Sequence, residues 1–226
     1  MTDVRKARPD DIPRAARLLH HSAADMYDRF SGGRERALRV LERSLGEPGT
    51  ASSAEVVWVA AALPQAPGSA ECARSAVPQA PGSAERARVD PPVAAAMAAF
   101  PVDEAAARSR AFLRLALRGA PPWRWPAALY LYWAGGRAAP TPPASAFYVD
   151  ALATDPALRR RGAARALLAE AERQARERGL PAVALDTTIS NEPARRLYAS
   201  EGFDEVAYRP PGRGLPGFVA LVKPLT

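Results

Sequence analysis

Apolar residues recur along the chain at two spacings, and these spacings predict alternating strands and helices. The runs 4–7, 55–63, 146–154 and 182–188 are short and contain β-branched or aromatic residues, which is typical of strands. Apolar residues return every three or four positions over 12–19, 37–45 and 163–178. This spacing gives a helix one apolar face, so three helices are expected there.

The C-terminal part continues the alternation. Residues 191–202 predict a short helix, with Pro193 in its first turn and Gly202 just past its end. The runs 203–209 and 217–224 predict two closing strands. Together with the earlier elements, this order indicates an α/β or α+β fold in which helices cover a sheet.

Three segments interrupt the pattern. The near-identical stretches PQAPGSAECAR and PQAPGSAERAR predict a low-complexity loop at about 64–90, inserted between strands and without chemistry of its own. Cys72 lies in that repeat, which argues against a catalytic thiol. Residues 92–100 are compatible with a strand or a helix, and 103–118 predict a helix.

Aromatic residues are concentrated in the segment 121–136. It contains Trp123, Trp125, Tyr130, Tyr132 and Trp133. Two interpretations are open: these rings line a ligand pocket, or they form a hydrophobic cap packed on the core. Buried aromatic residues mostly serve packing, so the cap is favoured.

Composition and charge narrow the function classes. The chain has 31 Lys+Arg against 24 Asp+Glu, a net charge of +7, but only two of the basic residues are lysines, Lys6 and Lys223. Arginines dispersed among glutamates are more typical of a solvated surface than of a nucleic-acid interface. One cysteine excludes an intramolecular disulfide, and two adjacent histidines do not predict a metal site.

The N-terminus lacks the apolar region of a signal peptide, and no apolar run approaches the length of a membrane span. We therefore expect a cytoplasmic protein without a membrane partner. A homodimer is compatible with the sequence.

One strand–turn–helix stretch points to chemistry. The sequence RRRGAARALL, residues 159–168, places several arginines directly ahead of a predicted helix, whose N-terminus is already electropositive. Gly162 would allow a ligand to approach the backbone, and the small residues Ala163 and Ala164 leave room for it. Unpaired backbone N–H groups at a helix start and fixed cations both favour an anion. We interpret the stretch as a pyrophosphate site.

Residues 146–208 resemble the GNAT acetyltransferases. The six residues Arg159–Ala164 fit the family pattern Q/R-x-x-G-x-G/A, which binds acetyl-CoA. The second family pattern, N-x-x-A-x-x-x-Y followed by G-F, is matched by Asn191, Ala194, Tyr198, Gly202 and Phe203. The resemblance covers the last 80 or so residues well, the N-terminal strand and helices loosely, and 64–145 poorly.

The resemblance implies a fold and a domain organisation. The fold class is α/β (α+β), a GNAT-like mixed and largely antiparallel sheet with splayed central strands and helices on both faces. The whole chain, 1–226, would be a single acetyltransferase domain. It would carry the inserted loop at about 64–90 and an aromatic-rich helical insert at about 103–140.

The resemblance also implies how acetyl-CoA is held as co-substrate. Backbone groups of Leu152, Ala153 and Thr154 would pair with its pantetheine arm, and Asn191 would lie near that arm, or simply cap the following helix. The pyrophosphate would rest on the turn and helix start, formed by Arg159, Arg160, Arg161, Gly162, Ala163, Ala164 and Arg165.

Catalytic roles follow from the same resemblance. Tyr198 would be the general acid that protonates the departing thiolate, since a neutral phenol suits that step. Strict alternation along 146–154 would place Tyr148, Asp150 and Leu152 on one face. Asp150 is therefore the first candidate for the general base and Asp186 the second. Tyr148 occupies the position where many family members have a glutamate, and family members also use a water chain in place of a carboxylate, so that alternative stays open.

The expected activity is acetyl-CoA-dependent N-acetylation of a primary amine on a small molecule or a protein. The aromatic segment slightly favours a small molecule. Two alternatives are a non-catalytic acyl-CoA-binding regulatory module and an acetyltransferase for a nucleic-acid-linked acceptor such as aminoacyl-tRNA. A nucleic-acid partner is disfavoured, because coenzyme A already accounts for the arginines.

Overall fold

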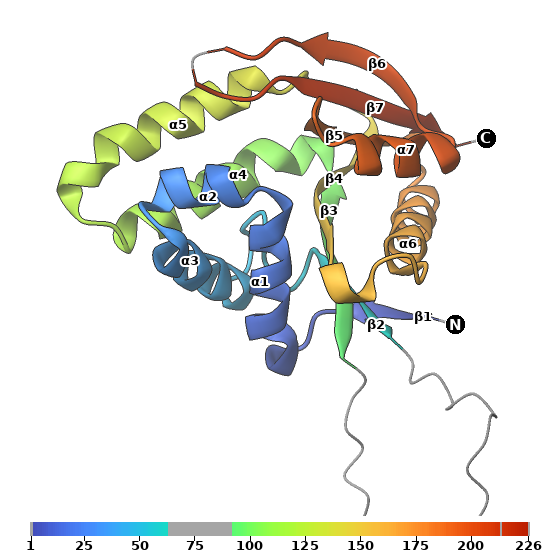
Figure 1. The fold of residues 1–226 in the computed structure, drawn as a ribbon, viewed down its shortest axis with the longest axis horizontal. Coiled ribbons are helices and arrows are strands. Elements are labelled where there is room, and N and C mark those ends of the chain that lie inside the picture. The colour runs from blue at the N-terminus through green and yellow to red at the C-terminus, as the bar shows by residue number, and fades with distance from the viewer. Residues whose placement is uncertain (1, 63–91, 213, 226) are drawn as a thin grey trace, which may run out of the picture.

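The computed structural model describes residues 2–62, 92–212 and 214–225 (Figure 1). The loop predicted at 64–90 and Cys72 lie outside these residues. The strands are β1 (Thr2–Lys6), β2 (Val57–Ala62), β3 (Val93–Pro101), β4 (Ala146–Thr154), β5 (Ala182–Thr188), β6 (Asp204–Arg209) and β7 (Phe218–Pro224). The α-helices are α1 (Ile12–Ser22), α2 (Ala24–Ser31), α3 (Arg34–Gly46), α4 (Val102–Arg118), α5 (Trp125–Ala138), α6 (Ala163–Glu177) and α7 (Glu192–Ser200).

The seven strands form one sheet in the order β1-β2-β3-β4-β5-β7-β6. Every neighbouring pair is antiparallel except β4 and β5, which run parallel. Helices α1–α5 lie on one side of the sheet, and α6 and α7 lie on the other (Figure 1). The predicted fold class, a largely antiparallel mixed sheet with helices on both faces, is confirmed.

Residues 92–100, whose sequence fitted either element, are a central strand. Six of the nine residues of β3 are alanine or valine, the others are one methionine, one phenylalanine and one proline, and all but the last residue are buried. A strand covered on both faces needs no alternation of polar and apolar residues. Small side chains on β3 also let α1 and α6 approach the sheet closely from opposite sides.

Helix α6 packs its predicted apolar face on the sheet. Leu167, Leu168, Ala171 and Ala175 are fully buried in the core cluster that includes Val183. A second cluster, around Leu19 and Leu41, joins α1 and α3 to the opposite face. These two cores pack on β4 from opposite faces of the sheet, and the first also packs on β5. The candidate site lies between the ends of these two strands.

The sequence pattern did not predict helix α2. Its eight residues, ADMYDRFS, include only one buried side chain, that of Ser31, so it lacks the apolar stripe that identifies the longer helices. The helix ends at Gly32, whose φ of 80° is left-handed.

The preference for a packed aromatic cap over 121–136 was wrong for most of its rings. Trp123 is 79% exposed and Trp133 49% exposed, and Trp125 and Tyr130 are also exposed. On α5 only Ala128 and Ala134 are buried. The helix packs against α2 and α4 through its small residues, so its large rings face outward.

No helix in the ranges that the structure covers is both long and apolar enough to cross a bilayer.

Candidate active site

Strands β4 and β5 separate halfway along their length. Their parallel pairing joins Ala146–Val149 to Ala182–Leu185 and goes no further. Beyond this point β4 pairs only with β3, and β5 only with β7. Among the described residues, the edge of β4 that faces β5 therefore has no strand partner at Leu152, Ala153 and Thr154, where the sequence predicted contacts with pantetheine.

A β-bulge lies at the point of separation. In the pairing of β3 with β4, Ala98 is opposite Ala151 and Ala99 is opposite Val149, so Asp150 has no partner. The extra residue interrupts alternation. Tyr148 packs near Phe100 on the side of α4, whereas Leu152 packs against the core beneath α6. The prediction that Tyr148, Asp150 and Leu152 share one face was therefore wrong.

The turn after β4 is built to present its backbone. Asp155 caps it by accepting a hydrogen bond from the Ala157 N–H at 2.8 Å. Arg160 has a φ of 61° and Gly162, the N-cap of α6, a φ of 80°. A Cβ added to Gly162 would meet no atom of a described residue within 4 Å, so none of these residues fills the space in front of it.

The backbone N–H groups of residues 159–165 have no hydrogen-bond acceptor in the part of the chain that the structure describes. The first N–H groups of a helix lack intrahelical partners, and they carry the positive end of the dipole. Arg159, Arg160, Arg161 and Gly162 are solvent-exposed, so no side chain in the described ranges covers this site. These features fit a bound diphosphate.

The arginines of the turn differ in their partners. Arg160 and Arg161 make no ion pair with any described residue, and Arg159 contacts the His21 ring at 3.1 Å. Arg165, which was also predicted to bind the anion, pairs with Glu201 of α7 at 2.5 Å. Its charge is thus partly compensated, and its role at the turn stays a prediction.

Two carboxyl groups and a phenol meet where the strands separate. The Tyr148 hydroxyl donates a hydrogen bond to Asp186 Oδ1. Burial raises the pKa of both groups, and the nearby carboxylates raise that of Tyr148 further. The role of Tyr148 was not predicted, since the pairing that places it beside Asp186 depends on the parallel register of β4 and β5.

The Asp150 side chain is exposed to solvent. Neighbouring protein atoms still desolvate its carboxyl in part, and this desolvation, together with the charge of Asp186, raises the pKa of Asp150 to about 7. Burial raises the pKa of Tyr27 on α2, and the charge of Asp150 raises it further. A carboxyl that titrates near neutral pH can accept a proton from a substrate under physiological conditions.

Tyr198 lies on α7, on the other side of the separated strands. Its ring is buried and packs on Phe203 with centroids 5.9 Å apart. Burial and the charge of Asp186 raise the pKa of the phenol to about 12. No described residue accepts or donates a hydrogen bond to the Tyr198 hydroxyl, so its proton is not committed to a protein partner.

Asn191 begins α7. Its side chain accepts a hydrogen bond from the Ala194 N–H at 3.4 Å and donates one to Thr187 Oγ1 at 3.1 Å. It therefore caps the helix that carries Tyr198 and links it to β5. Its side chain is exposed and remains accessible to a ligand.

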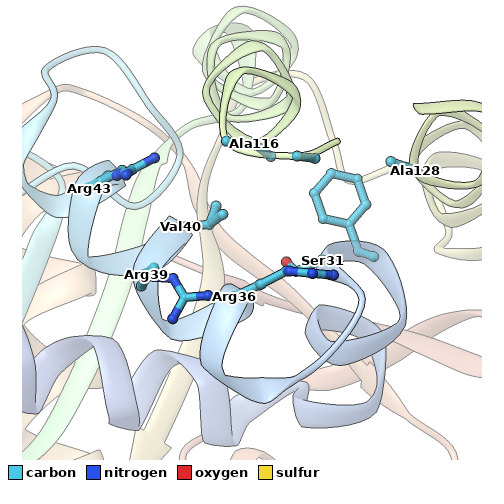
Figure 2. A pocket seen from close by; sticks show the side chains of 10 residues that line it. Ser31, Arg36, Arg39, Val40, Arg43, Ala116 and Ala128 are labelled. Atoms are coloured by element: carbon cyan, nitrogen blue, oxygen red, sulfur yellow. The ribbon is translucent and has the colours of Figure 1, made fainter. Parts of the chain in front are cut away.

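A small cavity lies apart from these residues. It has a volume of about 80 Å³ and lies where α2, α3, α4 and α5 meet (Figure 2). Arg36, Arg39 and Arg43 of α3 border it, with Phe30 and Ala116. None of the predicted site residues lines it. Within the described ranges, no group of three or more His, Cys, Asp or Glu residues is placed to hold a metal ion.

Comparison with known proteins gives one family match and many similar folds. Residues 127–203 match the model of the Acetyltransferase (GNAT) family. No curated protein matches the chain.

Three solved structures resemble the whole chain. The first is an N-acetyltransferase from Staphylococcus aureus Mu50, with 18% identity and a TM-score of 0.64 over 97% of this chain and 99% of that chain. The second is an acetyltransferase with 18% identity and a TM-score of 0.61, covering 99% and 100%. The third is the NatC complex bound to Gag peptide and CoA, with 12% identity and a TM-score of 0.52, covering 100% and 99%. At these identities the similarity shows the fold.

Proposed function

The chain carries an acetyltransferase (GNAT) family domain, matched over residues 127–203, and from that premise we propose that it transfers the acetyl group of acetyl-CoA directly to a primary amine. The observation that carries the proposal is the turn at 159–165. Its N–H groups have no acceptor among the described residues, its arginines are exposed, and it follows the edge of β4 that no described strand pairs with. Leu152, Ala153 and Thr154 bind the pantetheine arm, and the turn binds the diphosphate.

The chemistry requires three proton transfers. An amine is protonated at neutral pH, and Asp150 accepts the first proton to give the free nucleophile. The nitrogen then attacks the thioester carbon, the N–C bond forms and the C–S bond breaks. Tyr198 gives its proton to the departing sulfur, and the second proton lost by the nitrogen returns to the phenolate through solvent.

The acceptor is an amine on a small molecule or on a protein. A panel of primary amines, assayed for release of the free thiol of coenzyme A, tests the proposal. We expect thiol release that requires both acetyl-CoA and an amine. Binding of acetyl-CoA without thiol release for any amine would instead indicate a non-catalytic acyl-CoA-binding module. Thiol release only with aminoacyl-tRNA would indicate a nucleic-acid-linked acceptor.

A glycine pair tests the diphosphate site. Gly162 and Gly179 flank α6, both have left-handed φ angles, of 80° and 66°, and neither has an atom within 4 Å of an added Cβ. Alanine costs each position about 1–2 kcal/mol of backbone strain. Gly162→Ala also places a methyl group where the diphosphate binds, so we expect its KM for acetyl-CoA to rise about ten-fold, which corresponds to ~1.4 kcal/mol.

Gly179→Ala is the matched control for strain. It lies at the far end of α6, so it should lower the free energy of unfolding by a similar amount and leave the KM for acetyl-CoA unchanged. Equal effects of the two variants on KM would contradict the assignment of the turn.

A further inference from the structure

A groove lies between α5 and the loop that joins β6 to β7, apart from the diphosphate site. Its volume is about 390 Å³. Trp133 and Arg137 line it from the helix, and Arg209, Pro211, Leu215 and Pro216 line it from the strand end and loop. Figure 1 shows α5 running toward this end of the β6–β7 hairpin. The lining is apolar except for the two guanidinium groups.

Neither arginine has an acidic partner in the part of the chain that the structure describes. The guanidinium of Arg137 stacks over the Trp133 ring, with Cζ 3.6 Å from the ring centroid, and neither Arg137 nor Arg209 forms an ion pair with a described residue. The sequence contains no Asp or Glu from 105 to 149, although that stretch holds six arginines. A groove with aromatic and aliphatic walls and uncompensated guanidinium groups is complementary to an anion on an apolar body.

The groove opens on the face of the sheet that carries the carboxyl groups of Asp150 and Asp186. Arg209 is opposite Phe218, and Phe218 is opposite Thr188, so the three side chains project from the same face. Asp186 is two residues before Thr188 and projects from that face as well. Since neighbouring strands are about 4.8 Å apart, the Arg209 and Thr188 backbones are roughly 10 Å apart.

The loop that forms one wall is held in place by backbone contacts. Gly212 and Leu215 exchange two backbone hydrogen bonds of 3.2 and 2.9 Å, and the Gly217 carbonyl accepts one from the Ile189 N–H at 3.0 Å. Arg29 of α2 donates a hydrogen bond to the Gly214 carbonyl at 2.6 Å. The groove is thus formed before any ligand binds.

We propose that this groove binds the far end of the acceptor, and that the acceptor carries an anionic group, a carboxylate or phosphate, on an elongated apolar or aromatic body. The inference rests on the proposed function. The amine then lies at Asp150 and Asp186, while the anionic end lies between Arg137 and Arg209 with the body against Trp133.

Two probe amines of equal shape test this inference. The first is 4′-(aminomethyl)biphenyl-4-carboxylate, and the second is the corresponding neutral carboxamide. We expect kcat/KM for acetylation, and the binding constant from calorimetry, to favour the carboxylate by about ten-fold or more, because a charge-assisted hydrogen bond is stronger than a neutral one. The double variant Arg137→Gln/Arg209→Gln should lose this preference and acetylate the two probes with similar kcat/KM.

The control is Arg39→Gln, which removes another exposed arginine, at the separate cavity of Figure 2, and should keep the preference. Equal binding and turnover of the two probes by the wild-type chain would overturn the inference. Tight binding of the carboxylate without acetylation, in a chain that acetylates other amines, would overturn its assignment to the acceptor. The proposed function fails separately, if no amine supports thiol release.

Discussion

Tyr198→Phe should lower kcat by about a hundred-fold and leave the KM for acetyl-CoA nearly unchanged. The phenol is neutral at neutral pH because burial and the charge of Asp186 raise its pKa to about 12. A positioned general acid accelerates a reaction by about 10² to 10⁴. The interaction it provides is made only in the transition state, so its loss lowers kcat rather than the affinity for acetyl-CoA. The measurement is steady-state kinetics with one amine held constant across variants.

The same substitution distinguishes catalysis from packing. The Tyr198 hydroxyl has no hydrogen-bond partner among the residues that the structure covers, so Phe removes no stabilising bond and keeps the ring on Phe203. The free energy of unfolding should therefore stay within about 0.5 kcal/mol of the wild-type value. Tyr130→Phe, on the exposed surface of α5, is the control and should alter neither property. Full activity of Tyr198→Phe would assign the phenol to packing alone.

Asp150→Asn should remove the rise of kcat/KM between about pH 6 and 8 and lower kcat/KM at pH 8 by about a hundred-fold. The Asp150 carboxyl is raised to a pKa of about 7 by its surroundings and by Asp186. It becomes a base only as the pH rises through that value, so wild-type activity should increase between about pH 6 and 8. The amine titrates equally in both proteins, and the difference between the two profiles isolates Asp150.

Asp186→Asn tests why the pKa of Asp150 is raised. Removing this charge should shift the ascending limb of the pH profile to lower pH, because the carboxylate of Asp186 helps to raise the pKa of Asp150.

The folded state also holds the Asp150 proton more tightly than the unfolded chain does. The free energy of unfolding should therefore decrease as the pH rises from about 4 to about 7, and this slope should be smaller in Asp150→Asn. An unchanged ascending limb in Asp150→Asn would assign the base to another group.

Much of the sheet could be predicted from local patterns. Strands 146–154 and 182–188 have the predicted bounds, because apolar runs bordered by turn residues are recognisable without tertiary information. Helix α6 was equally clear from its apolar face. Helix α2 was missed because its eight residues lie mostly at the surface, and the outward-facing rings of α5 were missed because the aromatic content of a segment does not fix which side it turns to the core.

For the candidate site, too, some parts could be predicted from local sequence and others depend on contacts between distant strands. The turn at 159–165 follows from residue types alone: a glycine at a left-handed position and a helix start preceded by arginines. The bulge at Asp150 and the bond from Tyr148 to Asp186 arise between strands that are distant in the sequence. Alternation along a single strand cannot reveal a bulge, since the pairing with β3 determines which residue is left over. The proximity of Tyr148, Asp150 and Asp186 could therefore be found only from the structure.

Calorimetric titration of the chain with acetyl-CoA tests the central claim most directly, because it measures the occupancy of the turn at 159–165 without any acceptor. We expect saturable binding in the micromolar range, weakened about ten-fold by Gly162→Ala and unchanged by Gly179→Ala. Absence of binding heat at millimolar acetyl-CoA, with the chain folded, would contradict the account.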